Sequence, residues 1–156
     1  MSVSLGDLTP NNIKQLKLLN SVLFPEISLS EKYYQDCLNK TEWSQFGYFS
    51  DVNVGATSYC EEEIPEDKDN LRVYIYTLGV LPAYRRLGVG SKLLQYIFDN
   101  CKENNKIKQI YLHIPTNNES ALNFYKKHGF EIKETIKDYY DKSESNRDAY
   151  ILIKNL

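Results

Sequence analysis

Cysteine is scarce in this chain of 156 residues, and basic residues are not in excess. Cys37, Cys60 and Cys101 are odd in number, widely spaced and without a Cys-x-x-Cys pair. We therefore expect free thiols rather than a disulfide framework, and no metal site. A net charge of −2 provides no basic face for nucleic acid or for a membrane surface, so neither is expected as a partner.

Long apolar runs are missing as well. No run approaches the roughly 18 apolar residues that a membrane span needs. The first ten residues have no apolar core of the kind found in a signal peptide. We therefore expect a cytoplasmic protein, with the nucleus left open as a second location.

Two nucleotide-binding signatures are absent where glycines cluster. After Gly88 and Gly90, Leu93 stands where a dinucleotide fingerprint needs its third glycine. No Gly-Lys-Ser/Thr follows either, which excludes a P-loop. These absences leave other anionic ligands to consider for the same segment.

The segment from Arg85 to Gly90 reads Arg-Arg-Leu-Gly-Val-Gly. It lies between a strand predicted over 72–81 and a helical pattern that begins at Ser91. Glycines let backbone amides approach a ligand, and the start of a helix presents unpaired N–H groups to an anion. The segment therefore predicts a phosphate cradle, to which Arg85 and Arg86 add charge; the alternative is a surface turn that happens to contain two glycines.

The length of 156 residues predicts one domain over residues 1–156. Hydrophobic periodicity predicts the element order α-α-β-β-β-α-β-α-β-β. Thr9-Pro10 is expected to start a first helix that stops at Phe24-Pro25, and Ser30 to cap a second. Strands are expected over 46–50, 54–59, 72–81, 109–114, 130–137 and 149–154, and helices from Ser91 and over 118–128. Residues 51–53 are expected to form a turn, and the acidic segment 61–70 a solvated loop.

The Arg-x-x-Gly-x-Gly motif and this element order together resemble the GNAT acyl-CoA N-acetyltransferases. The resemblance implies an α/β (α+β) fold with a mixed, mostly antiparallel central sheet flanked by helices, and acetyl-CoA as cofactor. Further blocks are similar to the N-alpha-acetyltransferases of the NatE (San) type over nearly the whole chain. These blocks are 11–17, 24–25, 74–79, 84–90, 110–113, 118–121, 124–125, 129–131 and 138–140.

Acetyl transfer to an amine requires a base for the ammonium and a proton for the departing thiolate. Strand alternation places His113 opposite the face of Leu112, and a neighbouring strand could bring Tyr74 to the same cleft. Both are candidate bases; the alternative for His113 is a packed strand histidine, and strand tyrosines such as Tyr74 are common. The resemblance implies that Tyr125 donates a proton to the thiolate.

The resemblance also implies which residues hold acetyl-CoA. Backbone N–H groups of a bulged strand would bind the thioester oxygen, and the glycine segment would bind the pyrophosphate. Asn118 matches a cofactor contact but could equally be a helix start. The implied cofactor-binding residues are Leu78, Gly79, Val80, Arg85, Arg86, Leu87, Gly88, Val89, Gly90, Ser91, Asn118 and Tyr125.

The acceptor is expected to be a protein N-terminus. Its α-amine titrates near 7.7–8.0 and a lysine near 10.4, so freeing the lysine at neutral pH costs about 3.5 kcal/mol more. The resemblance places acceptor specificity at Phe24, Pro25, Glu26, Ile27, Tyr76, Tyr139 and Tyr140. These largely apolar residues suit a retained methionine followed by an apolar residue. Glu26 departs from the valine usual in the family and either points to water or lines the pocket.

Two other functions remain open on the sequence. One is a lysine or small-amine GNAT acetyltransferase, and the other is a non-catalytic subunit of an N-terminal acetylation complex. The intact segment from Arg85 to Gly90 together with His113 argues against the second. For partners, the resemblance implies association with the NatA complex and the ribosome.

Overall fold

The computed structural model describes residues 2–25, 27–140 and 148–156. Its strands are β1 (Val3–Asp7), β2 (Ser44–Phe49), β3 (Val52–Ile64), β4 (Asp67–Val80), β5 (Ile107–Pro115), β6 (Glu131–Ile136) and β7 (Ala149–Asn155). Its helices are α1 (Ile13–Leu23), α2 (Glu31–Asn39), α3 (Val89–Lys102) and α4 (Glu119–Lys127), with short 3-10 turns η1 (Thr41–Trp43) and η2 (Pro82–Tyr84). The strands hydrogen-bond in the order β1-β2-β3-β4-β5-β7-β6, which is the mixed sheet flanked by helices that the sequence predicted.

Two compact units divide the chain. The first unit comprises residues 1–60 and 75–104, and the second comprises residues 61–74 and 105–156. The expectation of a single domain over residues 1–156 stays a prediction. In the described residues, no helix is long and apolar enough to cross a membrane.

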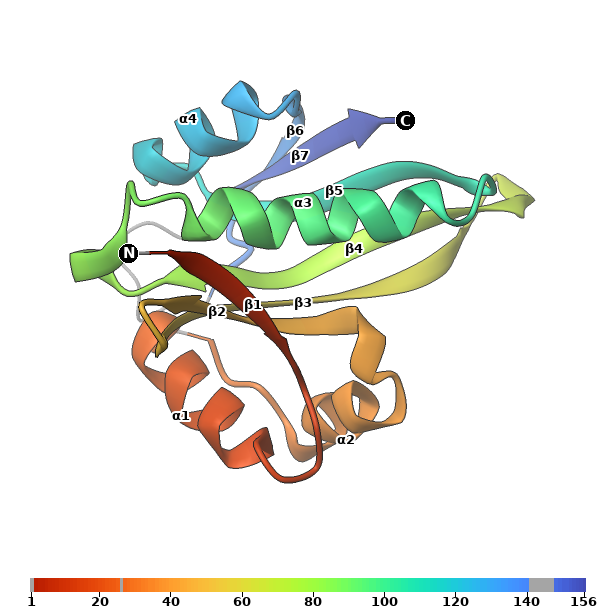
Figure 1. Cartoon of the computed structure of the whole chain (residues 1–156). Helices are drawn as coiled ribbons and strands as arrows, with labels where there is room; N and C mark the ends of the chain where they lie inside the picture. The colour runs from red at the N-terminus through yellow and green to blue at the C-terminus, as the bar shows by residue number, and fades with distance from the viewer. Residues whose placement is uncertain (1, 26, 141–147) are drawn as a thin grey trace. The chain divides into compact units, whose positions relative to one another are not determined.

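The first unit packs helices on both faces of its strands (Figure 1). One apolar cluster joins α1 and α2 to β2 and β3, with Leu16 and Phe46 at its centre. A second cluster joins α3 to the other face through Val89 and Leu93. Along α3 an apolar stripe faces the strands: Leu93, Leu94, Ile97 and Cys101 are buried, and Phe98 is half-buried. These two layers hold the start of α3 against the strands of the unit.

The second unit contains the parallel pair of the sheet. Strands β4 and β5 run parallel, with Tyr74 opposite Tyr111, and β5 then pairs antiparallel with β7. Along β5, Ile110, Leu112 and Ile114 are buried while Tyr111 and His113 are half-buried, which confirms the predicted alternation. Side chains at 111 and 113 therefore share a face with those at 72 and 74 of the neighbouring strand.

Several expected boundaries are wrong. Strand β1 precedes the first helix and was missed, because its five residues, three of them half-buried and two exposed, leave little periodic signal. The segment 61–70 is not a loop: β3 continues to Ile64 and β4 begins at Asp67, with Pro65 in the turn. Hydrogen bonding to neighbouring strands outweighs the poor β propensity of its acidic residues.

Turn and cap positions also differ from expectation. The turn between β2 and β3 is at Ser50 and Asp51, whose φ angles are 48° and 70°, rather than at 51–53. Helix α1 begins at Ile13 and not after Thr9. The Asn12 side-chain oxygen accepts the Thr9 N–H at 2.8 Å, which holds residues 9–12 in a turn before the helix. The Ser30 cap of α2 is confirmed, since its hydroxyl accepts the Tyr33 N–H at 3.1 Å.

Candidate active site

The glycine segment opens directly into α3. Gly88 has a φ of 94°, a left-handed conformation that glycine adopts without strain, and the helix begins at the next residue, Val89. The N-cap residue is Gly88 itself, so no N-cap side chain bonds to the first N–H groups of this helix. A Cβ at Gly88 would meet nothing within 4 Å. The helix start therefore offers donors, a positive dipole end and open space to an anion.

Two arginines flank this helix start in different ways. Arg85 Nε donates to the Val80 carbonyl at 3.1 Å, which ties the segment back to the end of β4. Arg86 is exposed and has a φ of 66°. A left-handed conformation costs a non-glycine residue about 1–2 kcal/mol, and such strain concentrates at functional sites. Both residues place positive charge beside the open helix end.

The end of β4 breaks the strand alternation. Residues 73, 75 and 77 are buried, but the next buried residue is Val80, so the phase changes by one residue between Thr77 and Val80. A bulge produces such a change. Thr57 Oγ1 donates to the Thr77 carbonyl at 2.6 Å, so that oxygen has a side-chain partner where the phase changes. The burial pattern of 78–80 is the kind that a bulge gives, and the role of its amides toward a carbonyl oxygen stays a prediction.

Tyr74 and His113 meet on neighbouring strands of the second unit. The Tyr74 hydroxyl and His113 Nδ1 are 2.9 Å apart and share a hydrogen bond. Desolvation lowers the pKa of His113 below its ordinary value, and the charge of Glu134 opposes that shift. Desolvation, with a smaller contribution from Tyr139, raises the pKa of Tyr74 far above its ordinary value. At neutral pH the pair is an uncharged imidazole beside an uncharged phenol.

One face of the His113 imidazole is covered by Tyr139. Its ring is stacked on the imidazole of His113, with the centroids 4.3 Å apart. Tyr140 then contacts Tyr139 edge-on at 5.0 Å. The structure thus brings Tyr139, one of the residues expected at the acceptor surface, against the candidate base.

Comparison with known proteins places these features in a family. The family profile described as "Acetyltransferase (GNAT) family" matches residues 16–130. The chain belongs to the GNAT acetyltransferase family. It is also 46% identical to N-alpha-acetyltransferase 50 of Danio rerio over 154 residues, which cover 99% of this chain and 89% of the relative. It is 43% identical to the probable N-acetyltransferase san of Drosophila melanogaster, over 99% of this chain and 82% of the relative.

A solved structure supports the same placement. Naa50 of Arabidopsis thaliana, in complex with the bisubstrate analogue CoA-Ac-MVNAL, aligns with a TM-score of 0.89 and 44% identity, over all of both chains. The GNAT fold, the relationship to NatE-type enzymes and the acetyltransferase class predicted from the sequence are therefore confirmed.

Helix α4 of this GNAT chain carries two further candidates. Asn118 caps the helix by accepting the Ala121 N–H at 3.1 Å, so its alternative role as a helix start is real. Tyr125 is buried, packs edge-on against Phe130, and has its pKa raised far above the ordinary value by desolvation. A phenol in that state keeps its proton until a stronger base forms beside it.

On the acceptor side, Phe24 packs against the end of β4. A Cβ on Gly79 would lie 2.9 Å from Phe24 Cζ, so only glycine admits the ring in its present position. Ile27 is 38% exposed and Tyr76 46% exposed, and Pro25 is also exposed. These residues all lie in the first unit, whereas Glu26 lies outside the described residues.

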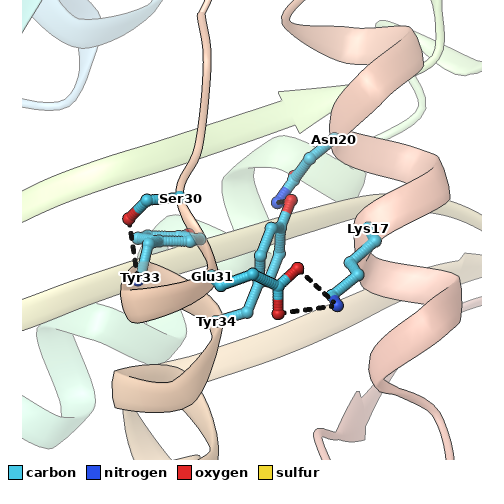
Figure 2. Close-up of polar contacts among 6 residues, drawn as sticks. All are labelled: Lys17, Asn20, Ser30, Glu31, Tyr33 and Tyr34. Atoms are coloured by element: carbon cyan, nitrogen blue, oxygen red, sulfur yellow. Dashed lines mark hydrogen bonds and ion pairs between the residues drawn. The ribbon is translucent and has the colours of Figure 1, made fainter.

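The chain segment that follows Phe24 is anchored between α1 and α2. Figure 2 shows Lys17 on α1 reaching both oxygens of Glu31 at 3.1 and 3.3 Å, and Ser30 capping α2 at the Tyr33 N–H. Asn20 Nδ2 also donates to the Tyr34 hydroxyl at 3.4 Å. These contacts join α1 to the start of α2.

Tyr76 also borders a cavity of about 250 Å³ in the first unit. Its ring meets Tyr33 edge-on at 5.4 Å, and Trp43 and Tyr59 line the same cavity. The expected role of Tyr76 at the acceptor surface stays a prediction. Among the described residues, no three His, Cys, Asp or Glu side chains are grouped to hold a metal ion.

Sequence reasoning missed three residues close to the Tyr74–His113 pair. These are Glu62, Arg72 and Tyr111, which bond to one another beside Tyr74. The available signal was the alternation of β5, which puts Tyr111 on the face of His113. The contacts of Glu62 with Arg72 and Tyr111 were missed because Glu62 was assigned to a solvated loop.

Proposed function

We propose that this chain transfers the acetyl group of acetyl-CoA to the α-amine of protein N-termini. The observation that carries the proposal is the hydrogen-bonded pair of Tyr74 and His113, with the pKa of the imidazole lowered by desolvation. A base whose pKa lies below neutrality is deprotonated at pH 7 and ready to accept a proton. An α-amine titrating near 7.7–8.0 suits such a base better than a lysine near 10.4, by about 3.5 kcal/mol.

The tautomer of His113 follows from the state of Tyr74. We assign Nδ1–H as the donor to the Tyr74 oxygen, because the phenol keeps its own proton and forms a side-chain hydrogen bond with Tyr139. This assignment leaves the lone pair of Nε2 for the proton of the acceptor ammonium. Tyr74 then orients the imidazole, and His113 is the base.

The remaining tasks fall to groups on the chain. The N–H groups at the start of α3, with Arg85 and Arg86, are suited to the pyrophosphate, and a Cβ at Gly88 would meet no atom within 4 Å. Acetyl-CoA, when bound, supplies the thioester carbon that the amine attacks. Backbone amides of 78–80 would stabilise charge on its oxygen. Tyr125 would donate its proton to the departing thiolate. His113 would take the first proton of the acceptor ammonium and pass it to water, and would take the second when the C–N bond forms. That second proton would return through solvent to Tyr125, so one proton is released for each acetyl group transferred.

For the acceptor we propose a retained methionine followed by an apolar residue. The analogue bound to the Arabidopsis thaliana relative carries the sequence Met-Val-Asn-Ala-Leu. In the first unit the half-buried Phe24 and the exposed Ile27 are apolar and carry no positive charge, and the same is true of the exposed Tyr139 in the second unit. A buried carboxylate at the second position would therefore have no partner. We also propose, on the family resemblance, a cytoplasmic location and association with NatA and the ribosome.

One assay tests the activity and the acceptor class together. Acetyl-CoA turnover would be measured on peptides beginning Met-Leu, Met-Val, Met-Glu and Ser, and on an N-terminally blocked peptide with an internal lysine. We expect Met-Leu and Met-Val to be acetylated fastest and the blocked peptide least. If Met-Glu or Ser peptides react faster, the NatE-type specificity is wrong; if the lysine peptide reacts fastest, the α-amine assignment is wrong.

The chemical roles are tested by two variants. His113→Ala should lower kcat by roughly 10²- to 10⁴-fold, and Tyr74→Phe by less, because it removes only the orienting hydrogen bond. Both variants should still be stabilised by acetyl-CoA. Near-normal turnover in both would leave the base role unfilled.

The partner proposal is tested by purification at gentle salt. Recovery of this chain without a larger subunit would count against that proposal.

A further inference from the structure

A continuous row of side chains crosses one face of the second unit. Arg72 Nε donates to Glu62 Oε1 at 2.7 Å, and the Tyr111 hydroxyl donates to the same oxygen. The Arg72 guanidinium also lies over the ring of Tyr111, 4.5 Å from its centroid. Cation–π and charge-assisted contacts of this kind are directional. One carboxylate and one guanidinium therefore fix both the hydroxyl end and a face of a single ring.

The ring fixed in this way packs on Tyr74. The two residues are Cα partners in the parallel ladder of β4 and β5, and their ring centroids are 4.8 Å apart at an angle of 50°. The ring of Tyr111 also lies edge-on to His113 at 6.4 Å. Close ring contacts between neighbouring strands restrict how either ring turns. The position of Tyr111 therefore limits the orientations open to the Tyr74 phenol.

We propose that Tyr111, held by Glu62 and Arg72, is a positioning residue that sets the orientation of Tyr74 toward His113. The inference rests on the proposed function, because it requires that pair to act in acetyl transfer. Tyr111 is assigned no contact with the reacting atoms. Its effect passes through Tyr74, whose hydroxyl has to stay within hydrogen-bonding distance of Nδ1. A purely structural role for the same three residues would stabilise the β3–β4 hairpin and leave turnover unchanged.

The first test compares two disrupting variants with matched controls. Tyr111→Phe removes the hydroxyl that binds Glu62, and Glu62→Ala removes its acceptor. Tyr96→Phe removes a comparable hydroxyl bond, 2.6 Å to the Glu42 carbonyl, and Glu63→Ala removes an exposed neighbouring carboxylate. We expect kcat to fall about 10- to 100-fold in the disrupting variants, as for small misplacements of reacting groups, with the peptide KM nearly unchanged.

Two further readouts separate positioning from stability. Glu62→Gln keeps an oxygen that accepts the Tyr111 hydroxyl, so it should recover part of the kcat lost in Glu62→Ala. The acidic limb of kcat against pH should move to higher pH in Tyr111→Phe. Desolvation is the main cause of the lowered His113 pKa, so water that enters a loosened site should raise that pKa. Melting temperatures measured on the same samples identify any loss of kcat caused by unfolding.

A double-mutant cycle with Tyr74→Phe decides the mechanism. If Tyr111 acts through Tyr74, adding Tyr111→Phe to Tyr74→Phe should cost no further kcat. Full multiplication of the two losses would overturn the inference, and so would a kcat matching the controls in both Tyr111→Phe and Glu62→Ala. An inactive His113→Ala beside a normal Tyr111→Phe would reject this inference alone. An active His113→Ala would reject the proposed function itself.

Discussion

The ring of Tyr139 lies parallel to the imidazole of His113, with an interplanar angle of 8°. The sequence placed Tyr139 only at the acceptor surface. The stack covers a face of the imidazole and contributes to the desolvation that lowers the His113 pKa. The residue that contacts the acceptor would then also tune the base.

Removing this stack should move the pH dependence of turnover. Tyr139→Leu exposes the imidazole to water, so the pKa of His113 should rise toward its ordinary value of about 6.5. The base works only when neutral, that is, above its pKa, so a higher pKa moves the acidic limb of kcat to higher pH. Tyr139→Phe keeps the ring and should keep the limb. Identical limbs in the two variants would rule out a role for the stack.

Removing the charge of Glu134 should shift the same limb in the opposite direction. Glu134 raises the pKa of His113 against the larger effect of desolvation. Glu134→Gln should therefore lower that pKa, and more activity should survive at acid pH. Because Glu134 is exposed, the shift should shrink as salt is added. Glu131→Gln, on the same strand, is the control. An upward shift in Glu134→Gln would contradict the assignment of His113 as the base.

The glycine segment predicts a thermal response to acetyl-CoA. Binding to the folded state alone raises the melting temperature by mass action. Gly88→Val forces a branched residue into a φ of 94° and fills the open space beside the helix start, so the shift should disappear. Leu18→Ala changes an exposed residue on α1 and should retain the full shift. An undiminished shift in Gly88→Val would remove the basis for the pyrophosphate site, for which Gly90 offers a second test.

The contact between Phe24 and Gly79 predicts a steric effect on the acceptor. In Gly79→Ala the new Cβ would lie 2.9 Å from Phe24 Cζ, so the ring has to move. We expect the peptide KM to rise about 10-fold, since one methyl group matters that much in an apolar site. Combining Gly79→Ala with Phe24→Leu makes room and should restore part of the affinity. A peptide KM unchanged in Gly79→Ala would show that Phe24 is not at the acceptor surface.

Much of the fold followed from periodicity. The alternation of β5 and the apolar stripe of α3 could be recognised in the sequence because one side of each element is more buried than the other. The acidic hairpin after Cys60 was not visible, since its residues favour loops and only pairing with other strands makes it regular. Short β1 was missed for a related reason: pairing with β2, rather than its own pattern, defines it.

The site was predictable where one element determined it. The glycine segment and the facing of His113 follow from local sequence alone. The contacts of Tyr139 and Glu62 depend on chain segments far apart in sequence, and no local pattern encodes which ring stacks on which. The effect of Glu26 on acceptor preference also stays a prediction. If Glu26 lines the pocket, acceptor peptides with Lys at the second position should be acetylated, and Glu26→Val should abolish that acetylation.

The left-handed conformation of Arg86 has a consequence for stability engineering. A search for stabilising substitutions would select this position first, because glycine or asparagine relieves a strain of about 1 kcal/mol there. Either replacement would also delete a cation beside the open start of α3. A library enriched for thermal tolerance should therefore yield variants at position 86 that melt higher without cofactor yet gain less from adding it.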